Sequence, residues 1–302
     1  MTTEIFSEIA EIGIPIPHGG ADLHSHTTAS DGMEAPRDQV RLAHRAGLEA
    51  LAVTDHDTVA GIAEAVAEGH KLDIHVIPGV EISTVESGVD IHILGYYVNE
   101  CDPVLLERLS RLRKTRDYRN VMITDKLTEQ GIPITMEEVV AELGRPLADG
   151  ESVGRPHIAD ALVRRGVVQD MREAFDKYLG ANGTAYVNPP RIRPYEAAEW
   201  IRDAGGAVVL AHPVLYGSDE LVERIVTEMK PDGIEVWHSD HDEQDVERYA
   251  ALAQRFNCIM TAGSDFHGAR QGKVFHGQLG SRRVSMDTVN ELRHIAERRR
   301  LT

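Results

Sequence analysis

Short apolar runs alternate with helical stretches along the first hundred residues of the chain. Four of these runs have the length of buried strands: 21–23, 50–53, 74–82 and 91–98. Apolar residues at the helical period between the first three runs predict helices at 36–46 and 59–68. This alternation of strand and helix is typical of an α/β fold.

The alternation lapses between residues 104 and 190, where the pattern is helical. Four helices punctuated by Gly and Pro are expected there: 105–130, 136–143, 155–165 and 171–179. No strand is expected among them. We interpret 104–190 as a helical insertion after the fourth strand, and as a lid domain.

Strand and helix alternate again in the last third of the chain. Three further strands are predicted at 207–210, 233–237 and 258–262. Four further helices are predicted at 195–204, 221–228, 246–256 and 286–299. Seven short strands separated by helices predict a parallel sheet closed into a barrel, which would comprise residues 19–103 and 191–302.

The composition is acidic, with a formal net charge of −17, and it includes 15 histidines in 302 residues. This charge opposes binding to long duplex nucleic acid. It does not exclude a small phosphorylated substrate, because local cations can invert the field in one cleft.

No part of the sequence predicts a membrane protein. No stretch approaches the roughly 20 apolar residues that span a bilayer. Residues 1–10 include Glu4 and Glu8 and do not resemble a signal peptide. Cys101 and Cys258 cannot form a disulfide framework, and we expect them to be buried thiols. A cytoplasmic location is therefore expected.

Histidines and carboxylates gather where the predicted strands end. In chain order these residues are Asp22, His24, His26, Asp31, Asp55, His56, Asp57, Glu81, His92, His212, His238, Asp265 and His267. In a parallel α/β barrel the carboxyl ends of all strands meet at one face, where active sites are built. The arrangement predicts a metal cluster at that face.

The spacing of the histidines supports this prediction. Residues i and i+2 of an extended chain point the same way, so His24 and His26 can both face the barrel mouth. Imidazole with carboxylate suits Zn, Mn or Fe, and Glu81 could bridge two ions. Two such ions can hold a hydroxide and clamp a phosphoryl group. A lone histidine at a strand end is more often an ordinary surface residue, which leaves His238 open, and Asp57 could serve only to orient His56.

Six motifs resemble the polymerase and histidinol phosphatase (PHP) family, in its stand-alone bacterial branch of the TrpH or YciV type. They are Asp22-Leu-His-Ser-His26, Thr54-Asp-His-Asp57, Pro78-Gly-Val-Glu81, Ile91-His-Ile-Leu94, Ala211-His-Pro213 and Gly263-Ser-Asp-Phe-His267. The resemblance covers 21–100 and 191–270 and includes the helical insertion. It implies a distorted (β/α)7 TIM-like barrel with up to three divalent ions.

The resemblance also implies a ligand set for each ion. The first ion would take His24, His26, Glu81 and Asp265. The second would share Glu81 and take His92 and His212. The third would take Asp31, His56 and His267. Many relatives have histidine where Asp31 stands, and a harder oxygen ligand there favours Mn, Fe or Mg over Zn.

A phosphate substrate also needs cations from side chains. Arg155 and His157 stand beside Pro156 at a predicted helix start, which suits an oxyanion site. Arg191 lies where the chain returns to the barrel, and Lys273 follows the last motif. With His238, these residues are the predicted substrate-binding set. The alternative is that these residues are ordinary surface charges.

The expected function is hydrolysis of a small phosphate ester by a metal-bridging hydroxide. Glu81, Asp265 and His267 are the predicted catalytic residues, and either Asp265 or His267 would protonate the leaving oxygen. The expected substrate is a nucleotide: a nucleoside 3′,5′-bisphosphate, an AMP-like molecule or the 5′ end of a short single-stranded RNA. A cyclic ribose phosphate or histidinol phosphate is the alternative within this class. An amidohydrolase and a non-catalytic metal-binding regulatory module are the alternatives outside it.

Overall fold

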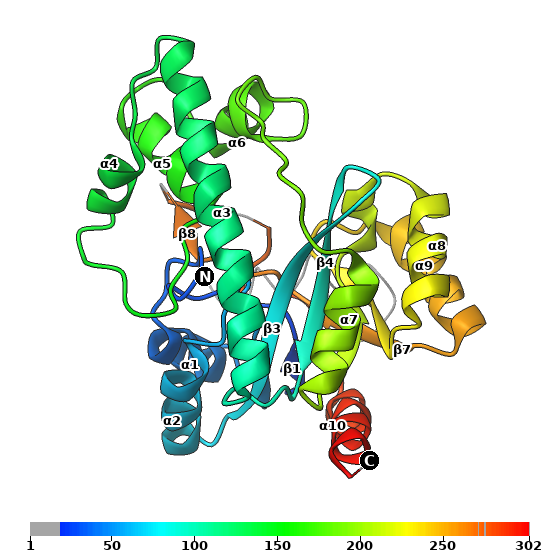
Figure 1. Cartoon of the computed structure of the whole chain (residues 1–302). Helices are drawn as coiled ribbons and strands as arrows, with labels where there is room; N and C mark the ends of the chain where they lie inside the picture. Colours follow the sequence, from blue (N-terminus) through cyan, green and yellow to red (C-terminus); the bar gives the residue numbers. More distant parts are fainter. Residues whose placement is uncertain (1–18, 271, 275, 302) are drawn as a thin grey trace.

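The computed structural model describes residues 19–270, 272–274 and 276–301, so the expectation about residues 1–10 lies outside the described part. Seven strands form one sheet in the order β1-β2-β3-β4-β5-β6-β7, with helices packed around it (Figure 1). Beyond β1, the backbone N–H of Leu23 donates to Ala262 O at 3.1 Å and that of His26 donates to Phe266 O at 2.8 Å. These bonds place the first strand beside the last. The sheet is therefore nearly closed into a barrel, and the predicted fold class is confirmed.

The strands lie close to their predicted positions. Their bounds are β1 Ala21–Asp22, β2 Ala50–Val53, β3 His75–Glu86, β4 Val89–Tyr96, β5 Ala207–Leu210, β6 Gly233–His238 and β7 Ile259–Gly263. A separate two-stranded hairpin, β8 (Ala269–Arg270) with β9 (Lys273–Val274), follows the last motif.

The prediction of a fully parallel sheet is wrong at one strand. β4 runs antiparallel to both β3 and β5, and no helix separates it from β3. The reason is a tight turn: only Ser87 and Gly88, both with positive φ, connect the two strands. Two residues can close a hairpin but cannot make the crossover that parallel strands need. β3 also continues four residues beyond its predicted end.

The helices follow the predicted periodicity. Around the barrel they are α1 Pro36–Arg45, α2 Ile62–Leu72, α7 Pro194–Asp203, α8 Asp219–Met229, α9 Glu243–Phe256 and α10 Met286–Arg300, with the short turn η3 Pro213–Tyr216 after β5. In the insertion they are α3 Pro103–Glu129, α4 Met136–Ala141, α5 Arg155–Arg164 and α6 Met171–Ala174, continued by the π-helical turn η2 Phe175–Leu179. Residues 104–190, all of them described, contain no strand.

The long helix α3 joins the insertion to the barrel (Figure 1). Leu105 and Leu109, in its first half, belong to the same buried cluster as strands β3 and β4. Ile123 and Leu127, in its second half, belong to the hydrophobic core of the insertion. The insertion therefore has a core of its own, and one continuous helix connects that core to the barrel.

Two further expectations can be compared with the structure. The expectation of buried thiols is wrong for Cys101, which is exposed just before α3, while Cys258 is half-buried. Among the described residues, no helix has both the length and the apolar character needed to span a membrane.

Candidate metal centre

Glu81 lies at the centre of a ring of histidines. Its Oε2 lies 3.2 Å from His26 Nε2 and 2.9 Å from His56 Nδ1. Its Oε1 lies 2.8 Å from His92 Nδ1 and 3.1 Å from His212 Nε2. Each carboxylate oxygen therefore faces a different pair of imidazoles, which is the arrangement that a carboxylate bridging two ions requires.

The antiparallel direction of β4 explains how His92 reaches this ring. His92 lies near the amino end of β4, not at its carboxyl end. An antiparallel strand presents its amino end where its parallel neighbours present their carboxyl ends. His92 therefore lies at the same face of the barrel as Glu81, directly opposite Ser83 in the strand register.

Asp265 adds a second carboxylate to the cluster. Its Oδ1 lies 3.3 Å from His24 Nε2 and 3.1 Å from His26 Nε2, and its Oδ2 lies 3.4 Å from His238 Nε2. Asp265 has φ of 52° and His212 has φ of 21°, both in the sparsely populated left-handed region. Such strain is commonly found at functional sites, where the surrounding structure holds the backbone in place.

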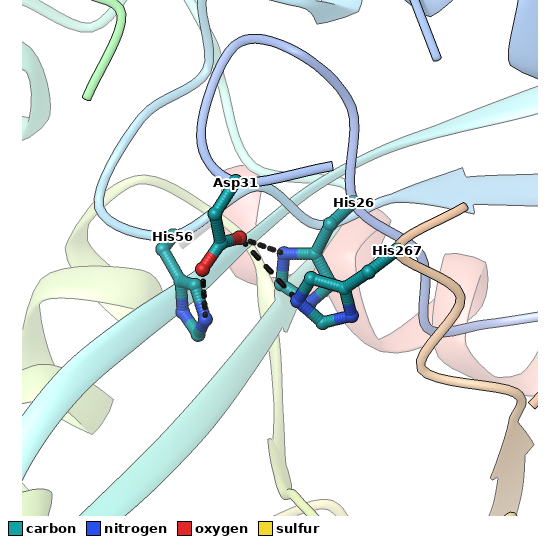
Figure 2. A group of neighbouring side chains, drawn as sticks. All are labelled: His26, Asp31, His56 and His267. Atoms are coloured by element: carbon teal, nitrogen blue, oxygen red, sulfur yellow. Dashed lines mark ion pairs between the residues drawn. The ribbon is translucent and has the colours of Figure 1, made fainter. Parts of the chain in front are cut away.

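A third carboxylate forms a neighbouring group. Figure 2 shows Asp31, from the turn between β1 and α1, facing the rings of His26, His56 and His267. Asp31 Oδ1 lies 3.3 Å from His267 Nε2, and Oδ2 lies 3.7 Å from His56 Nε2. One ligand atom from each of these four residues lies within 4.8 Å of all the others.

The cluster has the chemistry of a cation site. Buried polar atoms with no hydrogen-bond partner include His24 Nε2, both ring nitrogens of His26, Glu81 Oε2 and Asp265 Oδ1. Leaving such atoms unpaired is costly, and cations would satisfy them all. The residues present therefore fit divalent ions.

The pKa values of two histidines of the cluster are shifted in opposite directions by their surroundings. Burial lowers the pKa of His56 to about 4, so that this imidazole is neutral and its lone pair is available near pH 7. Burial alone would also lower the pKa of His26, but the adjacent carboxylates of Asp265 and Glu81 raise it to about 10. The two carboxylates therefore favour positive charge at this position, which a bound cation would also supply.

The cluster opens into a cavity of about 640 Å³ beneath the insertion. Asp31, Glu81, His92 and His212 form its floor, and α3, α5 and α6 contribute to its walls. A volume of this size suits a nucleotide or a sugar phosphate.

Sequence comparison assigns the chain to a protein family. A family described as PHP domain matches residues 22–187, more than half of the chain. The chain belongs to the PHP family.

Relatives cover most of the chain. It is 38% identical to the 5′-3′ exoribonuclease Rnm of Escherichia coli, over 82% of this chain and 84% of that one. It is 33% identical to a 3′,5′-nucleoside bisphosphate phosphatase of Chromobacterium violaceum, over 83% of this chain and 88% of that one. A solved structure from Bifidobacterium adolescentis, described as a candidate metal-dependent phosphoesterase, has a TM-score of 0.83 at 33% identity and covers 93% of this chain and 98% of that one.

These findings confirm the enzyme class expected from the motifs. The PHP chain is a metal-dependent phosphoesterase, as its relatives are hydrolytic phosphoesterases and nucleases. Its histidine and carboxylate clusters can bind metal ions.

The structure separates the predicted substrate-binding residues into two groups. Arg155 and Arg191 line the PHP cavity. His157, His238 and Lys273 are not among the described residues that line it. His157 accepts a hydrogen bond from the Gly154 N–H at 3.0 Å, so it caps α5.

His238 and Lys273 fail to reach the cavity for different reasons. His238 is fully buried, its Nε2 lies 3.4 Å from Asp265 Oδ2, and it belongs with His24 and Asp265 to a group that could hold a metal ion. The Lys273 side chain is 81% exposed, and its Nζ lies 3.8 Å from Asp170 Oδ2. Lys273 therefore lies on the surface. This position agrees with the alternative that the predicted substrate-binding residues include ordinary surface charges.

Several residues of the cavity were missed in the sequence. Arg116 and Arg119 come from α3, and Asp90 and His276 also line the cavity. Asp90 lies two residues before His92 on the same strand face, and that spacing could have revealed it. The arginines gave no comparable signal.

Glu235 is another residue that the sequence pattern missed, although it interrupts the apolar run of β6. It is fully buried, its Oε1 lies 3.1 Å from His24 Nδ1, and its Oε2 accepts from the His212 N–H at 2.8 Å. Because Nδ1 of His24 donates to this carboxylate, Nε2 presents its lone pair to the cluster. Glu235 therefore orients a predicted ligand of the PHP site.

Replacing this carboxylate with the isosteric amide is expected to weaken metal binding. Glu235→Gln should lower manganese affinity about 10- to 100-fold, because the amide cannot hold the His24 ring as a carboxylate does. Calorimetric titration of chelator-treated protein with Mn²⁺ measures the change. Glu247→Gln, at an exposed position on α9, is the matched control. Equal Mn²⁺ affinity in the two variants would show that Glu235 does not support metal binding.

Proposed function

We propose that this phosphoesterase hydrolyses the phosphate ester of a small nucleotide, including a nucleoside 3′,5′-bisphosphate or the 5′ end of a short single-stranded RNA. The observation that carries the proposal is Glu81, whose two oxygens face separate imidazole pairs at the floor of an arginine-lined cavity. Divalent ions held at such a carboxylate would suit phosphoryl chemistry.

The proposed ligand sets divide the cluster among three ions. The first set is His24, His26, Glu81 and Asp265; the second is Glu81, His92 and His212; the third is Asp31, His56 and His267. The distances around Glu81, Asp265 and Asp31 support this division, and His56 links two of its sets, because its Nδ1 lies 2.9 Å from Glu81 Oε2 while its Nε2 faces Asp31. Mn, Zn, Fe and Mg are the candidate metals. When bound, such ions act as Lewis acids that activate water and neutralise phosphate charge.

Protein side chains would complete the reaction. Arg155 and Arg191 would neutralise phosphoryl oxygens, since both line the cavity and carry planar guanidinium groups. His267 Nδ1 lies 2.8 Å from Asp265 O, a carbonyl that can only accept, so this nitrogen carries the hydrogen. His267 Nε2 would therefore present its lone pair to an ion, or, when the ring carries a second proton, donate that proton to the leaving oxygen.

Cavity and charge favour a short substrate. The insertion covers the barrel mouth, and we propose that residues 104–190 act as a lid over a barrel made of 19–103 and 191–302. A net charge of −17 repels long duplex nucleic acid. The names of the exoribonuclease and bisphosphate phosphatase relatives agree with nucleotide chemistry. A cytoplasmic location stays a prediction.

A substrate panel tests the proposal. Manganese-loaded protein should release phosphate or a nucleotide from adenosine 3′,5′-bisphosphate or from short 5′-phosphorylated RNA, at higher kcat/KM than from histidinol phosphate or cyclic ribose phosphates. Release of carboxylate or ammonia from amides, without phosphoester cleavage, would instead support an amidohydrolase. Metal binding without turnover of any substrate would support a regulatory module.

A further inference from the structure

Arg270 is a buried arginine that joins the helical insertion to the metal centre. It lies on β8, three residues after His267, and is 5% exposed. Its Nη1 donates to Asp160 Oδ2, on α5, at 2.7 Å, and its Nη2 donates to the backbone carbonyl of Asp31. One guanidinium group therefore connects a helix of the insertion with two segments that carry proposed ligands of the third ion.

Asp31 and His267 lie in loops, not in strands. Loops are more mobile than the strands they follow, so the contacts around them decide where their side chains lie. Two residues before Asp31, the Ala29 carbonyl accepts a 3.0 Å hydrogen bond from the N–H of Ser152, which belongs to the insertion. The hydrogen bonds of a charged, buried arginine are strong. The position of the Asp31 carboxylate therefore depends on how the insertion docks.

The insertion also contacts the loop of His56, the remaining ligand of this set. Arg116 Nη2, on α3, donates to Asp57 Oδ2 at 2.6 Å, and Arg113 Nη1 donates to Asp57 O at 2.8 Å. Asp57 has φ of 54°, a backbone conformation that surrounding contacts must hold in place. Each proposed ligand of the third ion therefore lies within three residues of a contact with the insertion or with Arg270.

The barrel itself holds the ligands of the other two proposed ions. Glu235, on β6, bonds to His24 Nδ1 and to the N–H of His212. Gln39, on α1, donates to His26 O at 2.9 Å. The bridging carboxylate lies within β3, which is paired along its length with neighbouring strands. Loss of a contact between insertion and barrel should therefore affect the third ion more than the first two.

We propose that Arg270 and Asp160 are positioning residues for the third ion. The ion pair between them couples docking of the insertion to binding of that ion. The coupling also acts in the opposite direction, since a free energy shared by two binding events is reciprocal: an ion at the third site stabilises the docked insertion. The inference rests on the proposed function, which includes the third ligand set, and it gives the insertion a role beyond covering the cavity.

Arg270→Lys tests the inference by calorimetric titration of chelator-treated protein with Mn²⁺. Wild-type protein should bind three ions. In the variant the third ion should bind about 10-fold more weakly, while the affinities of the first two stay unchanged. The reason is that a lysine ammonium can pair with Asp160 but lacks the fork of donors that also reaches the carbonyl of Asp31.

Arg165→Lys is the matched control. Arg165 Nη2 lies 3.2 Å from Glu138 Oε2, and its Nη1 donates to Pro133 O at 2.7 Å. This arginine also joins a carboxylate to a backbone carbonyl, but both acceptors belong to the insertion. Its titration should equal that of the wild type. Asp160→Asn, which removes the charge of the acceptor and keeps its size, should weaken the third ion selectively.

Hydrogen exchange measures the coupling in the opposite direction. Filling the third site of wild-type protein should slow amide exchange in α5, and the slowing should be smaller in Arg270→Lys. A residue that only stabilises the fold would lower the melting temperature and weaken all three ions together. A positioning residue weakens one of them.

The alternative is that the barrel alone holds the Asp31 loop, through Asp55, whose Oδ1 accepts from Ser30 Oγ at 2.6 Å. Unchanged affinity for the third ion in either variant, or equal weakening of all three ions, overturns the inference. Wild-type protein that binds only two ions also overturns it, and each of these results leaves the phosphoesterase proposal intact. Failure of fully loaded wild-type protein to cleave any nucleotide phosphate overturns the proposed function instead, without changing the ion count.

Discussion

Glu81→Gln is expected to lower kcat by about 1000-fold while the protein remains folded. Glu81 Oε2 faces His26 and His56, and Oε1 faces His92 and His212, so one carboxylate serves two proposed ion sites. An amide keeps the size of the side chain but loses its negative charge and one of its two acceptor oxygens. The neighbouring ions would then lose their shared ligand.

Steady-state phosphate release and elemental analysis of the purified variant measure this effect. Glu86→Gln is the matched control, because Glu86 ends the same strand and pairs with Arg193 at the rim, away from the cluster. It should retain wild-type turnover and metal content. Full activity in Glu81→Gln with metal still bound would refute the bridging role.

Removing the metal is expected to abolish turnover and to lower the melting temperature by at least about 5 °C. The carboxylates of Glu81, Asp265 and Asp31 lie together below the protein surface, and unpaired ligand atoms surround them. Cations that bind only the folded chain stabilise it by mass action, and chelation removes that stabilisation.

A chelator titration followed by dialysis measures both effects. Adding back Mn²⁺, Zn²⁺, Fe²⁺ or Mg²⁺ one at a time should restore activity and melting temperature together, and should rank the metals. The metal-dependent mechanism would be refuted if the protein kept its turnover in excess chelator and elemental analysis found no bound metal.

The position of the metal centre could be predicted because it depends on the chain's regular part. His24, His56 and His212 follow apolar runs whose ends must meet in a closed sheet, so their convergence needed no knowledge of side-chain packing. The antiparallel direction of β4 escaped prediction because its signal was only the pair Ser87 and Gly88 between two β-rich runs. His92 nevertheless lies at the predicted face of the barrel, because reversing the strand also reverses which of its ends lies at that face.

The arginines that α3 contributes to the cavity could not be predicted from the sequence for a different reason. Arg116 and Arg119 lie on a helix rich in charged residues, most of which face solvent. What distinguishes them is burial against β3 and the return segment that carries Arg191, and this depends on how the insertion docks. The helix start at residue 155 was predicted as an oxyanion site, and Arg155 and Pro156 do line the cavity, whereas His157 accepts the Gly154 N–H and caps the helix, a contact that the sequence pattern did not reveal.

The shared helix α3 limits how this enzyme can be recombined with its relatives. Leu105 and Leu109 pack in the hydrophobic core of the barrel. Ile123 and Leu127 pack in the hydrophobic core of the insertion. A chimaera joined within this helix would rotate one set by about 100° for each residue gained or lost. Exchanges of substrate specificity should therefore be spliced at the extended segments before residue 103 and after residue 187, so that the helix and the arginines it carries are transferred as one piece.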